Sequence, residues 1–198
     1  MRLWIAIRMT LVLTVLLGIA YPVAMVGIAH LLFPWQADGS LITRDGQVVG
    51  SELIGQNFSS AGYFQPRPSA AGDKGYDAGN SSGSNLGPTN KTLIDTVSQR
   101  VKALIEKNPG LNSTQIPIDM VTTSGSGLDP EISQAAADIQ VQRVAKARGL
   151  STDAVEHLIE AHTRDRWAGI VGEPGVNVLE LNLALDNLKP EHVASSTH

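Results

Sequence analysis

The first 36 residues constrain this chain most, because they form a long apolar segment without a single acidic residue. Their only charged side chains are Arg2 and Arg8, and almost every residue of the run 9–33 is apolar or small. A helix of about 20 apolar residues crosses the hydrocarbon core of a bilayer, so this run is long enough to span one. We therefore expect residues 1–36 to form a single N-terminal transmembrane anchor.

Two tryptophans favour that interpretation. Trp4 and Trp35 flank the run, and on one continuous helix they would lie roughly 45 Å apart. That span matches a bilayer with its headgroup regions, where Trp is enriched. A buried helix of a soluble protein is disfavoured because apolar residues cover every face. A signal peptide cleaved after Gly18-Ile19-Ala20 is an alternative, although cleavage there would leave an apolar stretch at the new N-terminus.

The flanking charges predict the orientation of the anchor. Arg2 and Arg8 precede the run, and the next Lys or Arg is Arg44. Positively charged flanks stay in the cytoplasm. We therefore expect a single-pass protein of the plasma (inner) membrane, with its N-terminus in the cytoplasm and residues 37–198 forming one extracytoplasmic domain.

The anchor also carries a stripe of small residues. Ala20, Ala24 and Gly27 follow one another at spacings of four and three residues, which lets another helix approach closely in lipid. Pro22 should loosen or kink the helix beside this stripe. Small residues are common in membrane helices for other reasons, so the stripe is a hypothesis for a docking face.

The composition excludes several classes of function. The chain has 19 acidic and 15 basic residues and a formal net charge of −4, and every acidic residue lies beyond position 36. This balance argues against a nucleic-acid binder, which needs many Lys and Arg contacts to phosphate. The absence of cysteine excludes disulfides, zinc–thiolate sites and a thiol nucleophile.

Hydrophobic spacing and turn signals predict an α+β outer domain, rich in helices and with a few short strands. The turn pairs Asp38-Gly39 and Asp45-Gly46 predict a β-hairpin at 41–49. Pro117 favours a short edge strand at 116–121. Helical spacing and capping residues predict helices at 89–107, at 130–148 behind an Asp129 cap, after Ser151, and after Asn177. The tail from Lys189 is polar and is expected to fray.

The segment 55–90 is rich in Gly, Ser, Asn and Pro, as a flexible linker would be. It nevertheless contains four of the nine aromatic residues of the chain, namely Phe58, Tyr63, Phe64 and Tyr76. Disordered linkers are poor in aromatic residues. We therefore expect a long ordered loop, pinned by these side chains, that serves as a binding element.

Three local patterns suggest catalytic or ligand chemistry, and each has a simpler interpretation. Gly79-x-Ser81-x-Gly83 matches the nucleophile elbow of a hydrolase, but polar coil replaces the required strand and helix. His157 and His162 are five residues apart, which puts them on different sides of a helix and favours solvated side chains over metal ligands. The turn 124–127 could present amides to an anion, but it also fits a plain loop, and Asp129 would repel phosphate.

The chain resembles the KdpC family along nearly its whole length. The segments that carry the resemblance are Tyr21-Pro22, Gly55-Gln56-Asn57-Phe58, Tyr63-Phe64, Arg67-Pro68-Ser69-Ala70, Tyr76-Asp77, 81–88 (SSGSNLGP), 121–130 (VTTSGSGLDP), 143–148 (RVAKAR), Gly172-Glu173-Pro174 and 176–182 (VNVLELN). Two places depart from the family pattern: Gln65-Pro66 stands where His-Gly is usual, and Glu131 where His or Asn is frequent. Those side chains cannot be essential if the function is kept.

The resemblance implies a subunit of the bacterial high-affinity potassium-transporting P-type ATPase. Its implied partners are a channel-like potassium-translocating subunit, the P-type ATPase subunit and a very small membrane peptide. The family is described as a catalytic chaperone that raises the ATP affinity of the ATPase subunit through a transient ternary complex with ATP. By the same resemblance Gln140 is a proposed nucleotide contact; no tightly bound cofactor or metal is implied.

We expect an accessory subunit rather than an enzyme. If residues 37–198 face outside, Gln140 does not meet cytoplasmic ATP, and any ATP effect is transmitted through the anchor. The alternatives are a cover over the potassium entrance that acts only in assembly, a membrane-anchored hydrolase using Ser81, and a stand-alone anchored sensor. The residues expected to contact partners are Ala20, Ala24, Gly27, Arg67, Ser69, Ser82, Ser84, Asn85, Ser126 and Asp129.

Overall fold

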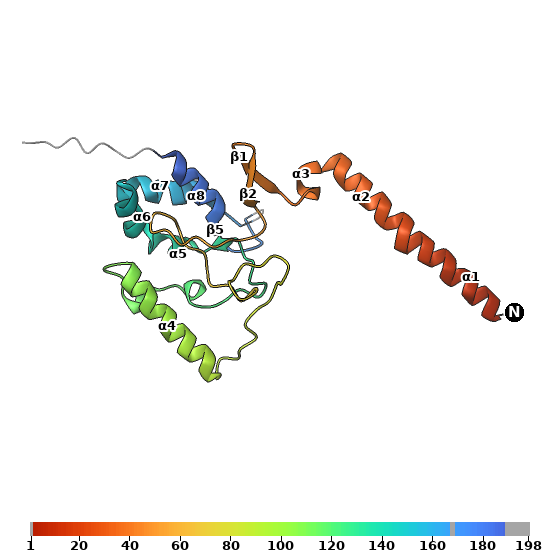
Figure 1. Ribbon diagram of the computed structural model, residues 1–198, viewed down its shortest axis with the longest axis horizontal. Helices are drawn as coiled ribbons and strands as arrows, with labels where there is room; N and C mark the ends of the chain where they lie inside the picture. Colours follow the sequence, from red (N-terminus) through yellow and green to blue (C-terminus); the bar gives the residue numbers. More distant parts are fainter. Residues whose placement is uncertain (1, 167–168, 189–198) are drawn as a thin grey trace, which may run out of the picture. The chain divides into compact units, whose positions relative to one another are not determined.

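The computed structural model describes residues 2–166 and 169–188 of the chain (Figure 1). It divides into two compact units, Met1–Ser51 and Glu52–His198. This division follows contacts within the chain, whereas the boundary expected at residue 36 separates membrane from water and stays a prediction. The expected frayed tail from Lys189 lies outside the described residues.

The first unit begins with one apolar helix. It runs from Arg2 to Leu32 as α1 (Arg2–Val15), a π-helical turn η1 (Leu16–Ala20) and α2 (Tyr21–Leu32). Its length and composition are sufficient to cross a membrane. The irregularity expected near Pro22 takes the form of η1, in which the Tyr21 N–H reaches back to the Leu16 carbonyl. A proline cannot donate a backbone hydrogen bond and crowds the preceding turn, and a π-bulge relieves both constraints.

The two tryptophans do not share one helix, which corrects the sequence-based expectation. Phe33 has non-helical angles (φ −138°, ψ 58°), and Trp35 lies in a separate short helix, α3 (Pro34–Ala37). Pro34 explains the break, because a residue before proline is disfavoured in the helical region. Trp35 donates its Nε1–H to the Leu41 carbonyl oxygen at 3.0 Å.

The predicted hairpin is confirmed. Strands β1 (Leu41–Arg44) and β2 (Gln47–Ser51) pair antiparallel, with a register shift between Ile42 and Thr43. The turn between them uses left-handed φ angles at Asp45 (51°) and Gly46 (77°), as two-residue hairpin turns require.

The second unit is α+β, which confirms the predicted class of fold. Its elements are α4 (Lys91–Lys107), η2 (Ser113–Gln115), η3 (Ile118–Met120), β3 (Glu131–Ile132), α5 (Gln134–Asp138), α6 (Val141–Arg148), α7 (Thr152–His162), β4 (Thr163–Arg164), β5 (Gly175–Asn177) and α8 (Val178–Asn187). The strands form a small antiparallel sheet in the order β3-β5-β4. Figure 1 shows α6, α7 and α8 gathered with β5, and α4 apart from them.

Three predicted helix starts are confirmed by side-chain caps. The Asn90 side chain accepts from the Thr92 N–H at the start of α4, and the Ser151 side chain caps α7. The Asn177 side chain accepts from the Glu180 N–H at the start of α8. Such caps satisfy N–H groups that have no partner within the helix.

The predicted strand at 116–121 is wrong, because the segment contains the 3₁₀ turn η3 (Ile118–Met120), and a first 3₁₀ turn, η2 (Ser113–Gln115), precedes it. Met120 and Val121 are both buried, whereas Ile118 is 76% exposed, so burial does not alternate as it would along a strand. Local hydrogen bonds close the second turn, from Met120 N–H to the Pro117 carbonyl and from Val121 N–H to the Ile118 carbonyl.

The helix expected behind Asp129 is also wrong in its start and its continuity. Glu131 and Ile132 pair with Asn177 and Val176 of β5, and the helix starts only after Ser133, whose hydroxyl accepts from the Ala136 N–H at 3.1 Å. The helical run is then interrupted at 139–140, which separates α5 from α6. Pairing with a strand from the far end of the domain overrides the local proline signal.

One hydrophobic core lies beneath these elements. The long loop contributes Phe64, which is fully buried. The other buried core residues are Leu104, Met120, Val121, Ile132, Ala136, Ala137, Val141, Val144, Ala145, Val155, Ile159, Val176, Val178, Leu181 and Leu185. The segment 55–90 contains neither helix nor strand, yet it is anchored in the core, which confirms the expectation of an ordered loop.

Candidate functional site

The long loop folds against the turn 124–130, and we call this region the loop–turn junction (residues 67–83 and 124–130). An ion pair joins Arg67 Nη1 to Asp129 Oδ2 at 2.8 Å, with both side chains largely buried. The Ser69 hydroxyl donates to the Gly127 carbonyl oxygen at 2.6 Å. The junction therefore joins two segments that are far apart in the sequence.

Serines of the loop continue this contact. The Ser82 N–H and the Ser81 hydroxyl both donate to the Ser126 carbonyl oxygen at 2.9 Å. Ser84 and Asn85, which were predicted together with these residues, are exposed. The structure thus brings Arg67, Ser69, Ser82, Ser126 and Asp129 together and leaves Ser84 and Asn85 at the surface beside them.

Close backbone approach makes glycine necessary in the junction. Gly127 has φ +69°, and a Cβ there would lie 2.5 Å from the Ser82 carbonyl oxygen and 2.8 Å from the Ala71 nitrogen. A Cβ at Gly55 would lie 2.6 Å from the Asp129 carbonyl oxygen. Larger side chains would push the loop and the turn apart.

Tyr76 holds the loop in shape from within. Its hydroxyl donates to the Arg67 carbonyl oxygen at 2.7 Å, and its N–H donates to the Ser69 hydroxyl at 2.8 Å. Its backbone is left-handed, with φ +57°, which is uncommon for a bulky residue. Burial, together with the nearby Asp129 carboxylate, raises the pKa of Tyr76 well above its usual range, so the hydroxyl stays a donor at physiological pH.

Side-chain amides fix a second stretch of the loop. Asn182 of α8 accepts from the Phe64 N–H at 2.8 Å and donates to the Phe64 carbonyl at 2.9 Å. Gln140 does the same one residue later, accepting from the Gln65 N–H at 2.8 Å and donating to the Gln65 carbonyl at 3.1 Å. Each amide replaces a strand partner for buried or half-buried backbone, which would otherwise be costly to desolvate.

Gln140 has little freedom for another ligand in this conformation. Its side chain is 1% exposed, its Nε2 also donates to the Ala136 carbonyl at 3.0 Å, and its Oε1 also accepts from Arg143. A direct nucleotide contact at Gln140 stays a prediction. Such a contact would require the amide to release Gln65.

Two arginines of α6 complete this attachment of the loop. Arg143 Nη1 donates to the Ala61 and Tyr63 carbonyls at 2.6 and 2.9 Å. Arg148 Nε donates to the Gly62 carbonyl at 2.7 Å, and its guanidinium lies 4.5 Å from the centre of the Tyr63 ring. Asp186 of α8 accepts from both the Tyr63 hydroxyl and Arg148.

Sequence reasoning did not assign these roles. Arg143, Arg148 and Asn182 lie in segments that carry the family resemblance, so their motifs were a usable signal. Asp186 gave no signal, because its partners Tyr63 and Arg148 are remote in the sequence. Only folding shows that these side chains bind loop backbone rather than solvent.

The two departures from the family pattern have a structural explanation. Gln65 holds Gln140 through its main-chain N–H and carbonyl, which any residue at that position provides. Glu131 lies 3.8 Å from Arg164, whose guanidinium also pairs with Glu52 and with Glu180. A different side chain at 131 would leave Arg164 with two other carboxylates.

The side chains of the three sequence patterns with possible chemistry make ordinary hydrogen bonds to nearby protein groups. The Ser81 hydroxyl donates to a carbonyl, as described above. His157 faces Glu160 at 3.3 Å, and His162 faces the Leu158 carbonyl at 2.9 Å. Within the turn 124–127, the Gly127 N–H donates to the Ser124 hydroxyl. In the part of the chain that is described, no three His, Asp or Glu side chains gather as a metal site would require.

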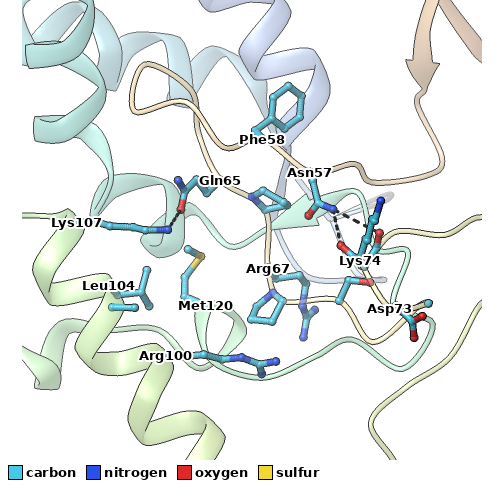
Figure 2. A pocket seen from close by; sticks show the side chains of 16 residues that line it. Asn57, Phe58, Gln65, Arg67, Asp73, Lys74, Arg100, Leu104, Lys107 and Met120 are labelled. Atoms are coloured by element: carbon cyan, nitrogen blue, oxygen red, sulfur yellow. Dashed lines mark hydrogen bonds between the residues drawn. The ribbon is translucent and has the colours of Figure 1, made fainter.

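A cavity of about 380 Å³ lies between α4 and the loop (Figure 2). Arg100 and Lys107 extend from α4, while Arg67 and Lys74 come from the loop. The Lys107 Nζ lies 3.5 Å from the Gln65 Oε1. Gln65 and Met120, which both line the cavity, also contact Gln140.

Comparison with known proteins places this chain among subunits of potassium-transporting ATPases. A family model described as "KdpC: K+-transporting ATPase, c chain" matches residues 3–187. A potassium-transporting ATPase KdpC subunit of Polaromonas naphthalenivorans is 55% identical over 185 residues, covering 93% of this chain and 94% of the relative.

Two further relatives carry the same name. That of Rhodopseudomonas palustris is 57% identical over 192 residues, covering 91% of this chain and 94% of the relative. That of Mycobacterium tuberculosis is 56% identical over 183 residues, covering 92% of this chain and 96% of the relative. The chain belongs to the KdpC family, which confirms the resemblance seen in its motifs.

Proposed function

We propose that this chain is an accessory, non-catalytic subunit of an ATP-driven, high-affinity potassium uptake complex. Membership of the KdpC family supports the assignment to a potassium uptake complex. The attachment of the loop 55–90 to the domain supports an accessory role that depends on protein contacts. Gln140 and side chains of α6 and α8 hold the backbone of residues 61–65, and contacts with the turn 124–130 hold residues 67–83. An ordered surface of this kind suits a protein contact, because little entropy is lost when it binds.

The sequence supports placing the transport chemistry in partner subunits. The chain lacks the T-V-G-Y-G filter sequence that selects potassium in channels. Asp73-Lys74-Gly75 lacks the threonine of the D-K-T-G phosphorylation motif. Potassium selection and phosphorylation then belong to the channel-like subunit and the P-type ATPase subunit, with the small membrane peptide completing the complex.

In the proposed arrangement the anchor packs along the potassium-translocating subunit and residues 37–198 lie outside the cell over its entrance. Ser84 and Asn85 contact the partner directly, since they are exposed. Arg67, Ser69, Ser82, Ser126 and Asp129 act by shaping that surface, because their hydrogen bonds are made within the junction. The acidic domain mildly favours cations near the entrance.

The chain also raises the ATP affinity of the ATPase subunit in this proposal. With the domain outside, ATP is bound on the other side of the membrane, and the effect passes through the anchor. Such coupling requires two states of the complex in which the anchor makes different contacts. The stripe of Ala20, Ala24 and Gly27 is the face that we assign to those contacts.

The orientation is tested by cysteine labelling, which is clean because the chain has no cysteine. Ser126→Cys and Ser113→Cys, both at exposed positions, are placed in otherwise unchanged chains in intact cells. A membrane-impermeant maleimide should label both without lysis. Labelling of both only after lysis would reverse the orientation and make a direct contact with cytoplasmic ATP feasible. Ser113 is not one of the junction residues, so its labelling reports the orientation even if a partner covers Ser126.

The docking face is tested by co-purification of the complex. Ala24→Leu puts a bulky side chain on the stripe and should lower the recovery of the partner subunits several-fold, because close helix contact requires small residues. Ala29→Leu is the matched control, since nine residues at 100° per residue place it opposite Ala20. Equal recovery with both variants would contradict the docking face. A chain recovered quantitatively without partners would favour the stand-alone sensor.

A further inference from the structure

The cavity between α4 and the loop is positively charged, although the domain around it carries all the acidic residues of the chain. Of the 16 described residues that line it, four are cationic, namely Arg67, Lys74, Arg100 and Lys107, and only Asp73 is anionic. Asp129 balances Arg67 through the ion pair at 2.8 Å. Positive charge is therefore in excess at this concave site.

The helix side of the cavity is a cationic stripe. Arg100 and Lys107 are seven residues apart on α4, which places them two turns apart on one face. Figure 2 shows both side chains extending toward the loop. Leu104 lies between them, is 8% exposed and anchors the helix in the core. Packing of Leu104 thus holds the face of α4 that carries the two cations against the core.

Neither arginine is fully paired: Arg100 has no carboxylate partner among the described residues, and Arg67 pairs with Asp129 through only one of its nitrogens. Arg100 Nη1 donates to the Val121 carbonyl at 2.8 Å, and burial lowers the pKa of Arg100 with no carboxylate to offset it. Arg67 Nε is buried and has no hydrogen-bond partner among the described residues. Desolvated guanidinium groups without full pairing are costly, and an anion in the cavity would lower that cost.

We propose that this cavity binds a small phosphate-class anion, with Arg67, Lys74, Arg100 and Lys107 as its ligands. Arginine forks and lysine ammonium groups are the usual partners of phosphoryl oxygens. The cavity volume of about 380 Å³ is in the range of small-molecule sites and admits a phosphate ester. The same chemistry is offered by a soluble phosphate compound and by the headgroup of a phospholipid.

Binding of radiolabelled pyrophosphate to the full chain in uncharged detergent tests the proposal by equilibrium dialysis. We expect saturable binding of one pyrophosphate per chain that weakens with added salt. The double variant Lys74→Gln/Lys107→Gln should weaken it about tenfold or more, since it removes two charged ligands. Both side chains are exposed, so the variant should fold.

The matched control is Lys102→Gln/Lys146→Gln, which removes the same charge from exposed positions outside the cavity. It should leave binding within about twofold of the unaltered chain. No saturable binding, or equal loss in the two double variants, would overturn the proposal.

Competition then distinguishes the two sources of the anion. Glycerol 3-phosphate and the soluble short-chain lipid dihexanoyl phosphatidic acid carry the same phosphate monoester. Equal displacement of pyrophosphate indicates a soluble phosphate compound, and much stronger displacement by the lipid indicates a headgroup. Failure of both to displace pyrophosphate would contradict a site for phosphate esters.

Discussion

Replacing Gln140 with leucine separates its structural role from a nucleotide contact. The substitution nearly conserves volume in a site that is 1% exposed, so it creates no sizeable cavity. It removes the acceptor for the Gln65 N–H and the donor to the Gln65 carbonyl. A buried backbone group without a partner costs about 1–3 kcal/mol. Because Gln65 is only half-buried and water can reach part of it, we expect a total loss of about 2–4 kcal/mol.

Urea unfolding of the full chain in detergent, followed by circular dichroism, measures this loss. With an m-value of about 2 kcal/mol/M, the midpoint should fall by about 1–2 M. Hydrogen exchange at the Gln65 amide should also accelerate, because the local attachment of the loop is broken. The urea midpoint of Gln140→Glu should lie between those of the unaltered chain and Gln140→Leu. A carboxylate can accept from the Gln65 N–H but cannot donate to the Gln65 carbonyl.

Gln142→Leu is the matched control, because Gln142 is exposed two residues away. An equal urea midpoint and equal amide protection in the two leucine variants would refute the structural role of Gln140. Weaker ATP binding by the assembled complex, with loop protection unchanged in Gln140→Leu, would instead favour a direct nucleotide contact.

Two other substitutions test the junction and the electrostatics of α5. Gly127→Ala should lower the free energy of unfolding by more than about 2 kcal/mol, because its Cβ would overlap the Ser82 carbonyl at a left-handed φ. The control Gly149→Ala is also left-handed but has open space around it, so it should cost only about 1 kcal/mol. Equal urea midpoints for the two variants would contradict the steric reason. Partial desolvation of Asp138, with Glu156 and Glu160 nearby, raises its pKa although the residue is exposed, so its ionisation destabilises the folded state as the pH rises above the unfolded-state pKa of about 3.9. Asp138→Asn should therefore unfold at higher urea than the unaltered chain at pH 7, and the difference should disappear below about pH 4; a difference that persists there would contradict the electrostatic cause.

Some features of the fold were predictable because their causes are local. The hairpin followed from the turn at Asp45-Gly46, and three helices from caps at Asn90, Ser151 and Asn177. The failures at 116–121 and behind Asp129 have a common reason. In both places local signals pointed to a regular element, but packing or pairing with a remote segment decided the backbone, as Ile132 shows by pairing with Val176.

The candidate site was predictable only in part, for the same reason. Arg67, Ser69 and Asp129 were expected to be functional, and the structure adds that Arg67 pairs with Asp129 while Ser69 binds the Gly127 carbonyl. The role of Gln65 could not be read from its side chain, because its backbone makes the contact. No spacing rule links Lys74 to Lys107, since a flexible-looking loop separates them in the sequence.

By itself, the sequence determined the membrane-spanning length of the apolar segment, the helix starts at Asn90, Ser151 and Asn177, and the family, because these depend on composition, local hydrogen bonding and motifs read in order. The tertiary structure alone decided which side chains hold the loop and where positive charge collects. Those properties arise when α4, α6 and α8 meet the loop 55–90, since contacts between remote segments depend on how the whole domain packs.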